Sequence, residues 1–206
     1  MIPAEAFLSK KSPLMRRLIK AHGPAELEIS KRSPYQALVT AVAHQQLNGR
    51  AAMAILNRFT ALFPKAKFPQ PAQLLATSDE TLRACGFSAS KILALRDIAA
   101  KTISGLVPTR AAALKLSNEE LIQRLVTLRG VGRWTVEMLL IFTLGREDIF
   151  PADDFGVRQG YKVAMKLEAM PAPKDLAKIA EPWQPHRTLA AWYLWRAADA
   201  AKLSKS

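Results

Sequence analysis

The chain has 206 residues, 50% of them hydrophobic, and a formal net charge of +13. These values indicate a globular protein of one large domain or two small ones with a basic face and a polyanionic partner, and they exclude a disordered basic tail. The single cysteine, Cys85, excludes a disulfide framework, a multi-cysteine zinc site and a cysteine-ligated iron–sulfur cluster.

The N-terminal segment, from Met1 to Lys11, carries its basic charges after its apolar residues, which is the reverse of a secretory signal. The longest apolar stretch, residues 138–144, is far shorter than the roughly 20 residues that a membrane span requires. We therefore expect a soluble protein of a reducing compartment.

Apolar residues recur at helical spacing almost throughout the chain, and strict period-two alternation is missing, so the sequence predicts an all-α protein. Residues 77–80 and 117–120 match the capping box that marks a helix start, with Thr77 and Ser117 as the hydroxyl residues. Prolines at 64, 69, 71, 171 and 173 predict corners of the chain. We expect helices at about 12–22, 34–46, 49–63, 78–85, 89–103, 118–127, 133–144, 154–165, 173–181 and 187–202.

Two glycines, Gly130 and Gly132, separate a helix that ends near Thr127 from one that starts near Arg133. Glycine permits a tight turn without a side chain in the way, so backbone amides and the positive end of the second helix can hold a phosphate oxygen. Such a contact reads no base sequence. An ordinary helix–turn–helix corner with Gly130 as its C-cap is the alternative that these residues leave open.

Two adjacent acids, Asp153 and Asp154, follow Pro151 and precede a helical run. Asp153 is expected to cap that helix, because an N-cap is a common position for aspartate. Asp154 then requires a second function, and the positive end of a helix favours a carboxylate there.

These motifs together resemble the helix-hairpin-helix (HhH-GPD) superfamily of DNA glycosylases, in which such a hairpin is followed, across one helix, by a proline-containing loop that ends in the catalytic aspartate. The chain is most similar to the DNA-3-methyladenine glycosylase II (alkylbase) branch. The likeness covers most of residues 12–200 and rests on Gly130-Val-Gly-Arg-Trp-Thr, Pro151-Ala-Asp-Asp, Trp183-x-Pro-x-Arg187 and Trp192-Tyr-Leu-Trp195. It implies two helical subdomains that flank a DNA-binding cleft, one of residues 37–146 with the hairpin and one of residues 1–36 plus 147–206.

The activity that the resemblance implies is that of a monofunctional hydrolase in base excision repair. It would flip an alkylated purine, such as 3-methyladenine or 7-methylguanine, out of double-stranded DNA and hydrolyse its N-glycosidic bond, leaving an abasic site. Asp154 is the expected catalytic residue, because this reaction develops positive charge on the deoxyribose. Bifunctional members carry a nucleophilic lysine where this chain has Trp134. A bifunctional glycosylase/lyase and a non-catalytic DNA-damage-binding module stay open as alternatives.

Aromatic faces select cationic alkylated purines through cation–π contact. The resemblance implies a base pocket of Trp134, Trp195, Phe155 and Met138. Packing in the protein core at helical spacing is the alternative, most seriously for Phe155 and Trp192.

A residue must also fill the gap that a flipped base leaves. The loop of residues 44–49 occupies the family's wedge position, so Gln46 or Leu47 is the expected wedge, against the alternative that these residues only cap helix ends. Lys91 and Arg96 could contact phosphate or remain solvated charges. Arg187 could hold Asp153 or the closing helix. The full expected DNA-binding set is Gly130, Val131, Gly132, Arg133, Thr135, Gln46 and Leu47.

No organic cofactor and no iron–sulfur cluster are expected. The resemblance implies a structural Na⁺ or K⁺ on the backbone carbonyls of Val126, Leu128 and Val131. The expected partner is double-stranded DNA that contains alkylated bases, with no membrane partner. The protein is expected to be a monomer that works in the bacterial nucleoid of the cytoplasm or in a nucleus.

Overall fold

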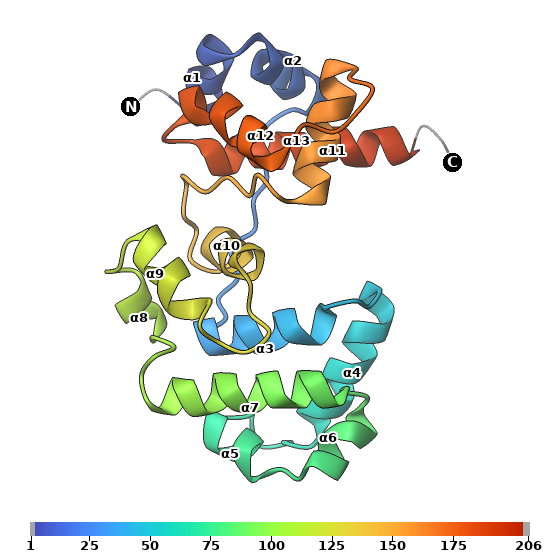
Figure 1. The fold of residues 1–206 in the computed structure, drawn as a ribbon, viewed down its shortest axis with the longest axis vertical. Helices are drawn as coiled ribbons and strands as arrows, with labels where there is room; N and C mark the ends of the chain where they lie inside the picture. The colour runs from blue at the N-terminus through green and yellow to red at the C-terminus, as the bar shows by residue number, and fades with distance from the viewer. Residues whose placement is uncertain (1–2, 204–206) are drawn as a thin grey trace. The chain divides into compact units, whose positions relative to one another are not determined.

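The computed structural model describes residues 3–203, and this part of the chain forms helices without a strand, which confirms the all-α prediction (Figure 1). Within the same residues, no helix has the length and apolar character that crossing a membrane would require. The elements in chain order are α1 (Ala4–Lys11), α2 (Pro13–His22), α3 (Pro34–His44), α4 (Gly49–Ala61), α5 (Pro71–Ala76), α6 (Asp79–Cys85), α7 (Ala89–Ile103), α8 (Arg110–Ala113), α9 (Asn118–Leu125), α10 (Arg133–Phe142), α11 (Phe155–Met165), α12 (Pro173–Ile179), the 3₁₀ turn η1 (Glu181–Trp183) and α13 (Arg187–Leu203).

Four of these elements, α1, α5, α8 and η1, are absent from the predicted set. The error at α5 has a clear cause. Pro71 was expected to form a corner, but it occupies the first helical position, where the missing amide costs no hydrogen bond. The side chain of Gln73 also accepts a 2.8 Å hydrogen bond from the amide of Gln70 and so stabilises the helix start.

The chain divides into two compact units. The middle unit is Ser30–Leu139, and the terminal unit takes in the described parts of Met1–Ile29 and Leu140–Ser206. The middle unit therefore begins at Ser30 and ends at Leu139, whereas the sequence predicted a middle subdomain of residues 37–146. Helix α10 contains the second dividing point.

In the middle unit, α3 and α7 lie side by side, with α5 packed against α7 and α4 against α3 (Figure 1). Leu38, Val42, Leu95 and Ile98 are fully buried between these helices. Phe59 of α4 closes the core with edge-to-face contacts to three other phenylalanine rings, those of Phe63, Phe68 and Phe87. The start of α7 meets the end of α3, where Lys91 donates to the carbonyl of Ala43.

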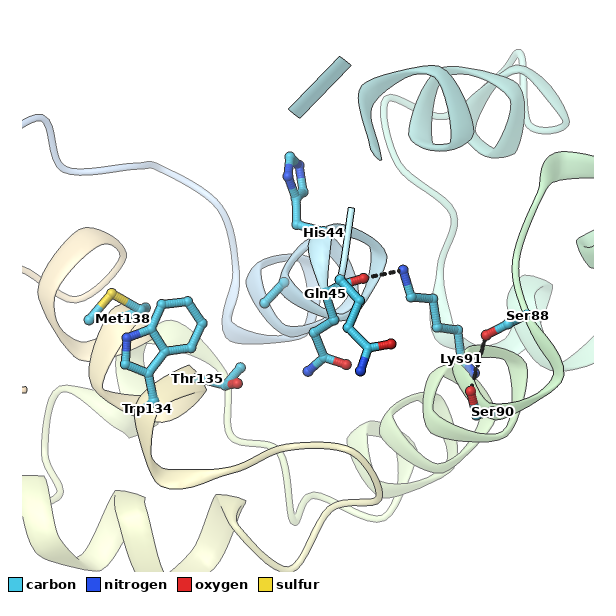
Figure 2. A pocket seen from close by; sticks show the side chains of 10 residues that line it. His44, Gln45, Ser88, Ser90, Lys91, Trp134, Thr135 and Met138 are labelled. Carbon is cyan, nitrogen blue, oxygen red and sulfur yellow. Dashed lines mark hydrogen bonds between the residues drawn. The ribbon is translucent and has the colours of Figure 1, made fainter. Parts of the chain in front are cut away.

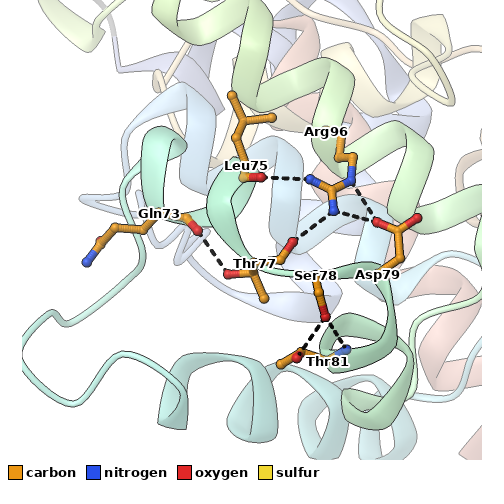
Figure 3. Close-up of polar contacts among 7 residues, drawn as sticks. All are labelled: Gln73, Leu75, Thr77, Ser78, Asp79, Thr81 and Arg96. Atoms are coloured by element: carbon orange, nitrogen blue, oxygen red, sulfur yellow. Dashed lines mark hydrogen bonds and ion pairs between the residues drawn. The ribbon is translucent and has the colours of Figure 1, made fainter.

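Arg96 of α7 joins the end of α5 to the start of α6 (Figure 3). Its guanidinium donates to the carbonyls of Leu75 at 2.9 Å and Thr77 at 2.8 Å and pairs with the carboxylate of Asp79. Arg96 is therefore part of the fold, which differs from both roles that the sequence left open. Ser78, not Thr77, caps α6 and accepts from the amide of Thr81, so the predicted capping box of Thr77 and Glu80 is wrong.

In the terminal unit, α11 packs closely along α13, and α1 and α2 complete the core. The helices approach at Gly160, where a Cβ atom would lie 1.8 Å from the carbonyl oxygen of Leu194. The Tyr193 hydroxyl donates at 3.0 Å to the carbonyl of Gly23 and ties α13 to the end of α2. This packing fixes the position of α13 against the start of α11.

Arg187, at the start of α13, pairs with Asp148 through two hydrogen bonds, Nε to Oδ1 at 2.6 Å and Nη2 to Oδ2 at 2.8 Å. The expectation that it holds Asp153 is wrong, whereas it does hold the closing helix. Two parallel hydrogen bonds match the planar guanidinium to the carboxylate and fix where α13 begins.

Candidate functional site

The hairpin between α9 and α10 begins two residues earlier than predicted, because α9 ends at Leu125 and not near Thr127. Val126 is the C-cap of α9, so the alternative with Gly130 as the C-cap is wrong. Helix α10 begins at Arg133 and Ser117 caps α9, both as predicted. Ser117 and Glu120 form the predicted capping box at the start of α9, with hydrogen bonds of 3.2 Å and 2.7 Å. Gly130 has a φ angle of +72°, which favours glycine. Gly132 does not adopt this conformation, and a Cβ atom there would meet nothing within 4 Å. The backbone at Gly132 is therefore open to close approach by a ligand.

Two side chains of α7, Asp97 and Lys101, bind the backbone of the hairpin loop. The carboxylate of Asp97 accepts a 2.8 Å hydrogen bond from the amide of Arg129, and the Lys101 ammonium donates at 3.2 Å to the carbonyl of Thr127. Asp97 and Lys101 also pair with each other at 3.3 Å. Sequence reasoning missed these two anchors. Their i, i+4 spacing marks them as a helix pair, but no local signal shows that they face the hairpin.

The predicted DNA contact Arg133 begins α10 beside two carboxylates. Its Nε lies 3.1 Å from Glu137 Oε1 and its Nη2 lies 3.3 Å from Glu119 Oε2. These ion pairs orient the guanidinium at the hairpin surface. The two carboxylates also offset part of its positive charge.

A pocket of about 520 Å³ lies in the middle unit beside the hairpin (Figure 2). It brings together four of the predicted site residues, Trp134, Thr135, Met138 and Gln46. Trp134 remains 48% exposed, so core packing does not account for it, whereas Thr135 is buried. The lining residues are Ala41, His44, Gln45, Gln46, Ser88, Ser90, Lys91, Trp134, Thr135 and Met138.

The predicted wedge residues lie in the wedge loop, which we define as Gln45–Asn48 between α3 and α4. Gln46 has a φ angle of +56°, an uncommon conformation for a residue other than glycine, and Leu47 is 40% exposed. Asn48 caps α4 by accepting a 2.9 Å hydrogen bond from the amide of Ala51. Helix capping therefore explains Asn48 and leaves Gln46 and Leu47 without that role.

Lys91 is half-buried, and its ammonium is held by backbone carbonyls of the fold. Its ammonium donates at 2.8 Å to each of two carbonyls at the end of α3, those of Ala43 and Gln45. Burial lowers the pKa of the Lys91 amine. Lys91 thus stabilises the C-terminal end of α3, where the helix dipole favours a positive charge.

Asp154, in the terminal unit, is the N-cap of α11. The prediction that Asp153 caps this helix is wrong, because α11 begins at Phe155 and the cap is the residue directly before it. The Asp154 Oδ1 atom accepts two hydrogen bonds of 2.8 Å, from the amide of Val157 and from the indole Nε1 of Trp195. Asp154 is half-buried, whereas Asp153 is exposed. Two donors on one oxygen fix the direction of this carboxylate.

The Trp195 indole lies against the start of α11 and stacks on Phe142, with ring centroids 5.6 Å apart and planes inclined by 28°. A Cβ atom at Gly156 would lie 2.8 Å from Trp195 Cδ1, so glycine leaves the room that the indole occupies. Phe142 is one of several apolar residues of α10 and belongs to no motif, so sequence reasoning missed it. Phe155 is 61% exposed, so core packing does not account for it.

Core packing does account for Trp192, which is partly buried against the core of the terminal unit. Its ring meets that of Tyr193 edge to face at 5.0 Å, and the Arg196 guanidinium lies 5.3 Å from its centroid.

The four residues predicted to form the base pocket are divided between the two units. Trp195 and Phe155 belong to the terminal unit with Asp154, and Trp134 and Met138 belong to the middle unit.

The predicted cation carbonyls lie on the hairpin. Among them, the Leu128 carbonyl accepts a 3.2 Å hydrogen bond from the amide of Val131. Because a carbonyl oxygen has a second lone pair, this bond is compatible with a cation ligand at the same atom. In the described part of the chain, no group of three or more His, Cys, Asp and Glu side chains is suited to a metal ion.

Residues 39–185 match the family model described as the HhH-GPD superfamily base excision DNA repair protein. DNA-3-methyladenine glycosylase 1 of Schizosaccharomyces pombe is 47% identical over 98% of this chain and 90% of its own length. The structure of the 3-methyladenine DNA glycosylase of that yeast in complex with abasic DNA aligns with a TM-score of 0.85, 48% identity and coverage of 94% of this chain and 95% of that one. A DNA-3-methyladenine glycosidase from Bacillus halodurans aligns with a TM-score of 0.87, 30% identity and coverage of 98% and 91%.

Proposed function

Because the chain belongs to the HhH-GPD superfamily of base excision DNA repair proteins, we propose that it is a DNA-3-methyladenine glycosylase. It binds double-stranded DNA, flips out an alkylated purine and hydrolyses the N-glycosidic bond, which leaves an abasic site. The similarity to two alkylbase glycosylases over nearly the whole chain supports this substrate class.

The observation that carries the proposal is the environment of Asp154. It is a half-buried carboxylate whose Oδ1 atom is held by Trp195 and by the α11 amide of Val157, in a family that cleaves glycosidic bonds. Cleavage leaves positive charge on the deoxyribose, and a fixed carboxylate stabilises that charge without reorganising. The same carboxylate orients or deprotonates the attacking water. Asp154 is the catalytic residue in this proposal.

Trp134 and Trp195 supply aromatic faces for the target base, with Phe155 and Met138 as their neighbours. Alkylation gives 3-methyladenine and 7-methylguanine a formal positive charge, which both makes the base a good leaving group and attracts it to an electron-rich ring. The exposure of Trp134 beside a pocket of about 520 Å³ supports its role.

The hairpin holds a phosphate of the DNA backbone through the amides around Gly132, and Arg133 and Thr135 lie in the following turn. The open surface at Gly132 supports this contact. Gln46 or Leu47 fills the gap left by the flipped base, and the exposed wedge loop supports that role. A Na⁺ or K⁺ held by the carbonyls of Val126, Leu128 and Val131 would add positive charge beside the same phosphate.

The reaction is monofunctional in this proposal, because Trp134 occupies the position of the lyase lysine and tryptophan is no amine nucleophile. Sodium borohydride traps the Schiff base of a lyase as a covalent DNA adduct. We expect no adduct with abasic duplex DNA, and a trapped adduct would identify a bifunctional enzyme. The protein acts as a monomer in the nucleoid or nucleus, where its DNA substrate lies.

The direct test compares base release from methylated duplex DNA by the wild type and by Asp154→Asn. Asparagine keeps the N-cap and an oxygen acceptor for the Trp195 indole, so the fold should survive. We expect release at least about a hundredfold slower from the variant, with binding to abasic DNA retained. The neighbouring Asp153→Asn serves as the matched control and should release base at the wild-type rate.

If neither protein releases a base while both bind the DNA, the chain is a damage-binding module. Equal release by the wild type and Asp154→Asn would remove Asp154 from the chemistry.

A further inference from the structure

The side chain of Gln45 joins the wedge loop to the hairpin. Gln45 follows the last residue of α3, and its Nε2 atom donates a 2.9 Å hydrogen bond to the carbonyl of Gly130, which lies 85 residues away in the chain. Gly130 has a left-handed φ angle of +72°. The first residue of the wedge loop therefore contacts the turn of the hairpin directly.

The backbone of Gln45 is held from the other side by Lys91 (Figure 2). The Lys91 ammonium donates at 2.8 Å to the carbonyl of Gln45 and at 2.8 Å to that of Ala43. Gln45 is thus fixed at its carbonyl by α7 and at its side-chain amide by the hairpin. Both contacts lie within the middle unit.

These contacts flank a residue in a costly conformation. Gln46 has a φ angle of +56°, and such backbone conformations persist only where neighbouring contacts determine them. On one side of Gln46 lies the doubly held Gln45, and on the other lies Asn48, fixed as the N-cap of α4. The loop is therefore shaped before any ligand binds.

We propose that Gln45 and Lys91 are positioning residues that lock the wedge loop onto the hairpin. The inference rests on the proposed function and goes beyond it: the hairpin on the phosphate backbone and the wedge in the base stack act at a fixed spacing. Unstacking a base is costly, and a loop ordered in advance adds no ordering cost at that moment. Lesion discrimination should then depend on two residues that hold the wedge loop and are not themselves the wedge.

The test measures the preference for an abasic duplex over the same intact duplex, as a ratio of Kd values from fluorescence anisotropy. Gln45→Met keeps the length of the side chain and removes its donor, and Lys91→Met removes both ammonium contacts. We expect each to reduce the preference roughly five- to tenfold, the range for losing such hydrogen bonds. Lys91→Arg, which retains donors for both carbonyls, should restore most of it.

Each variant is repeated in a chain whose wedge has been removed by Gln46→Ala together with Leu47→Ala. If Gln45 and Lys91 act through the wedge, their substitution has no further effect on the preference in that background. Equal losses in both backgrounds, or no loss in the wild-type background, would overturn the inference. Gln123→Met, at an exposed position of α9, is the matched control and should change nothing.

The proposed function and the positioning role of Gln45 and Lys91 can be tested separately. If the wild-type chain shows no preference for the abasic duplex, the proposed function fails and the inference fails with it. If the wild type has the preference and the Gln45 and Lys91 variants keep it, the inference alone fails. Thermal unfolding of every variant shows whether the fold is intact.

Discussion

The indole of Trp195 donates a hydrogen bond of 2.8 Å to Oδ1 of Asp154, from a position 41 residues later in the chain. The same ring stacks on Phe142, and Gly156 leaves the space that it fills. Trp195 therefore does more than provide an aromatic surface. It fixes the direction of the carboxylate that the proposed reaction uses.

Trp195→Phe separates these two contributions. Phenylalanine retains an aromatic ring against Phe142 and loses the indole donor, so we expect base release to fall roughly tenfold while affinity for abasic DNA is kept. Single-turnover rates and equilibrium binding measure the two quantities. Trp192→Phe is the matched control, because Trp192 contacts the core. An unchanged release rate in Trp195→Phe would show that the hydrogen bond is dispensable.

Trp134→Ala tests the selection of cationic bases. Loss of one aromatic face should lower the rate ratio for 7-methylguanine over unmodified guanine by roughly thirtyfold, because a desolvated cation–π contact contributes about 2 kcal/mol. Trp134→Phe should keep most of the ratio. The expectation fails if both variants discriminate as well as the wild type does.

Gly160→Ala should destabilise the terminal unit strongly. The added Cβ would lie 1.8 Å from the Leu194 carbonyl oxygen, so α11 and α13 must move apart, at a cost of about 3 kcal/mol. Urea unfolding followed by circular dichroism measures the change. Gly49→Ala is the control, since a Cβ there meets nothing within 4 Å and alanine favours the helix. Similar stabilities for the two variants would contradict the packing described here.

Arg96→Met should destabilise the middle unit by about 2 kcal/mol. The substitution removes the donors for the Leu75 and Thr77 carbonyls, whose hydrogen bonds are partly buried, and the partner of the exposed Asp79 carboxylate. The free energy of unfolding in urea gives the magnitude. Arg83→Met removes an exposed arginine from α6 and should leave stability nearly unchanged. An equal loss of unfolding free energy in Arg96→Met and Arg83→Met would show that the contacts of Arg96 add no stability.

The capping box at the start of α9 should lose its contribution to stability at low pH. Hydrogen bonds from the side chain and the backbone amide of Ser117 lower the pKa of the Glu120 carboxyl below its ordinary value of 4.5. A lowered folded-state pKa means that this contribution to stability is complete above pH 4.5 and is lost as the pH falls through the folded-state pKa. Ser117→Ala should raise the pKa toward 4.5, as followed by NMR titration of Glu120. A pKa unchanged by the substitution would exclude the hydroxyl as its cause.

Much of the helical framework could be predicted from sequence because helix signals are local. Apolar spacing located the longer helices, and the Ser117 capping box was correct. The short helices α5 and α8 were missed, since six and four residues contain too little periodicity and depend on tertiary packing.

The two capping errors have a common cause. Thr77 and Ser78 both carry hydroxyls, and Asp153 and Asp154 both carry carboxylates, so either member of each pair satisfies the local rule. Packing of the buried face sets the helix register and thereby selects the cap, which is Ser78 for α6 and Asp154 for α11.

The sequence by itself determined the all-α class, the glycine hairpin and the acid pair after Pro151, because periodicity, glycine conformation and helix capping act over a few residues. Only the tertiary structure decided which side chains hold those motifs in place. The Trp195 indole reaches Asp154 across 41 residues and Gln45 reaches Gly130 across 85. No local rule specifies such pairs, since they exist only where packed helices bring distant segments of the chain within hydrogen-bonding distance.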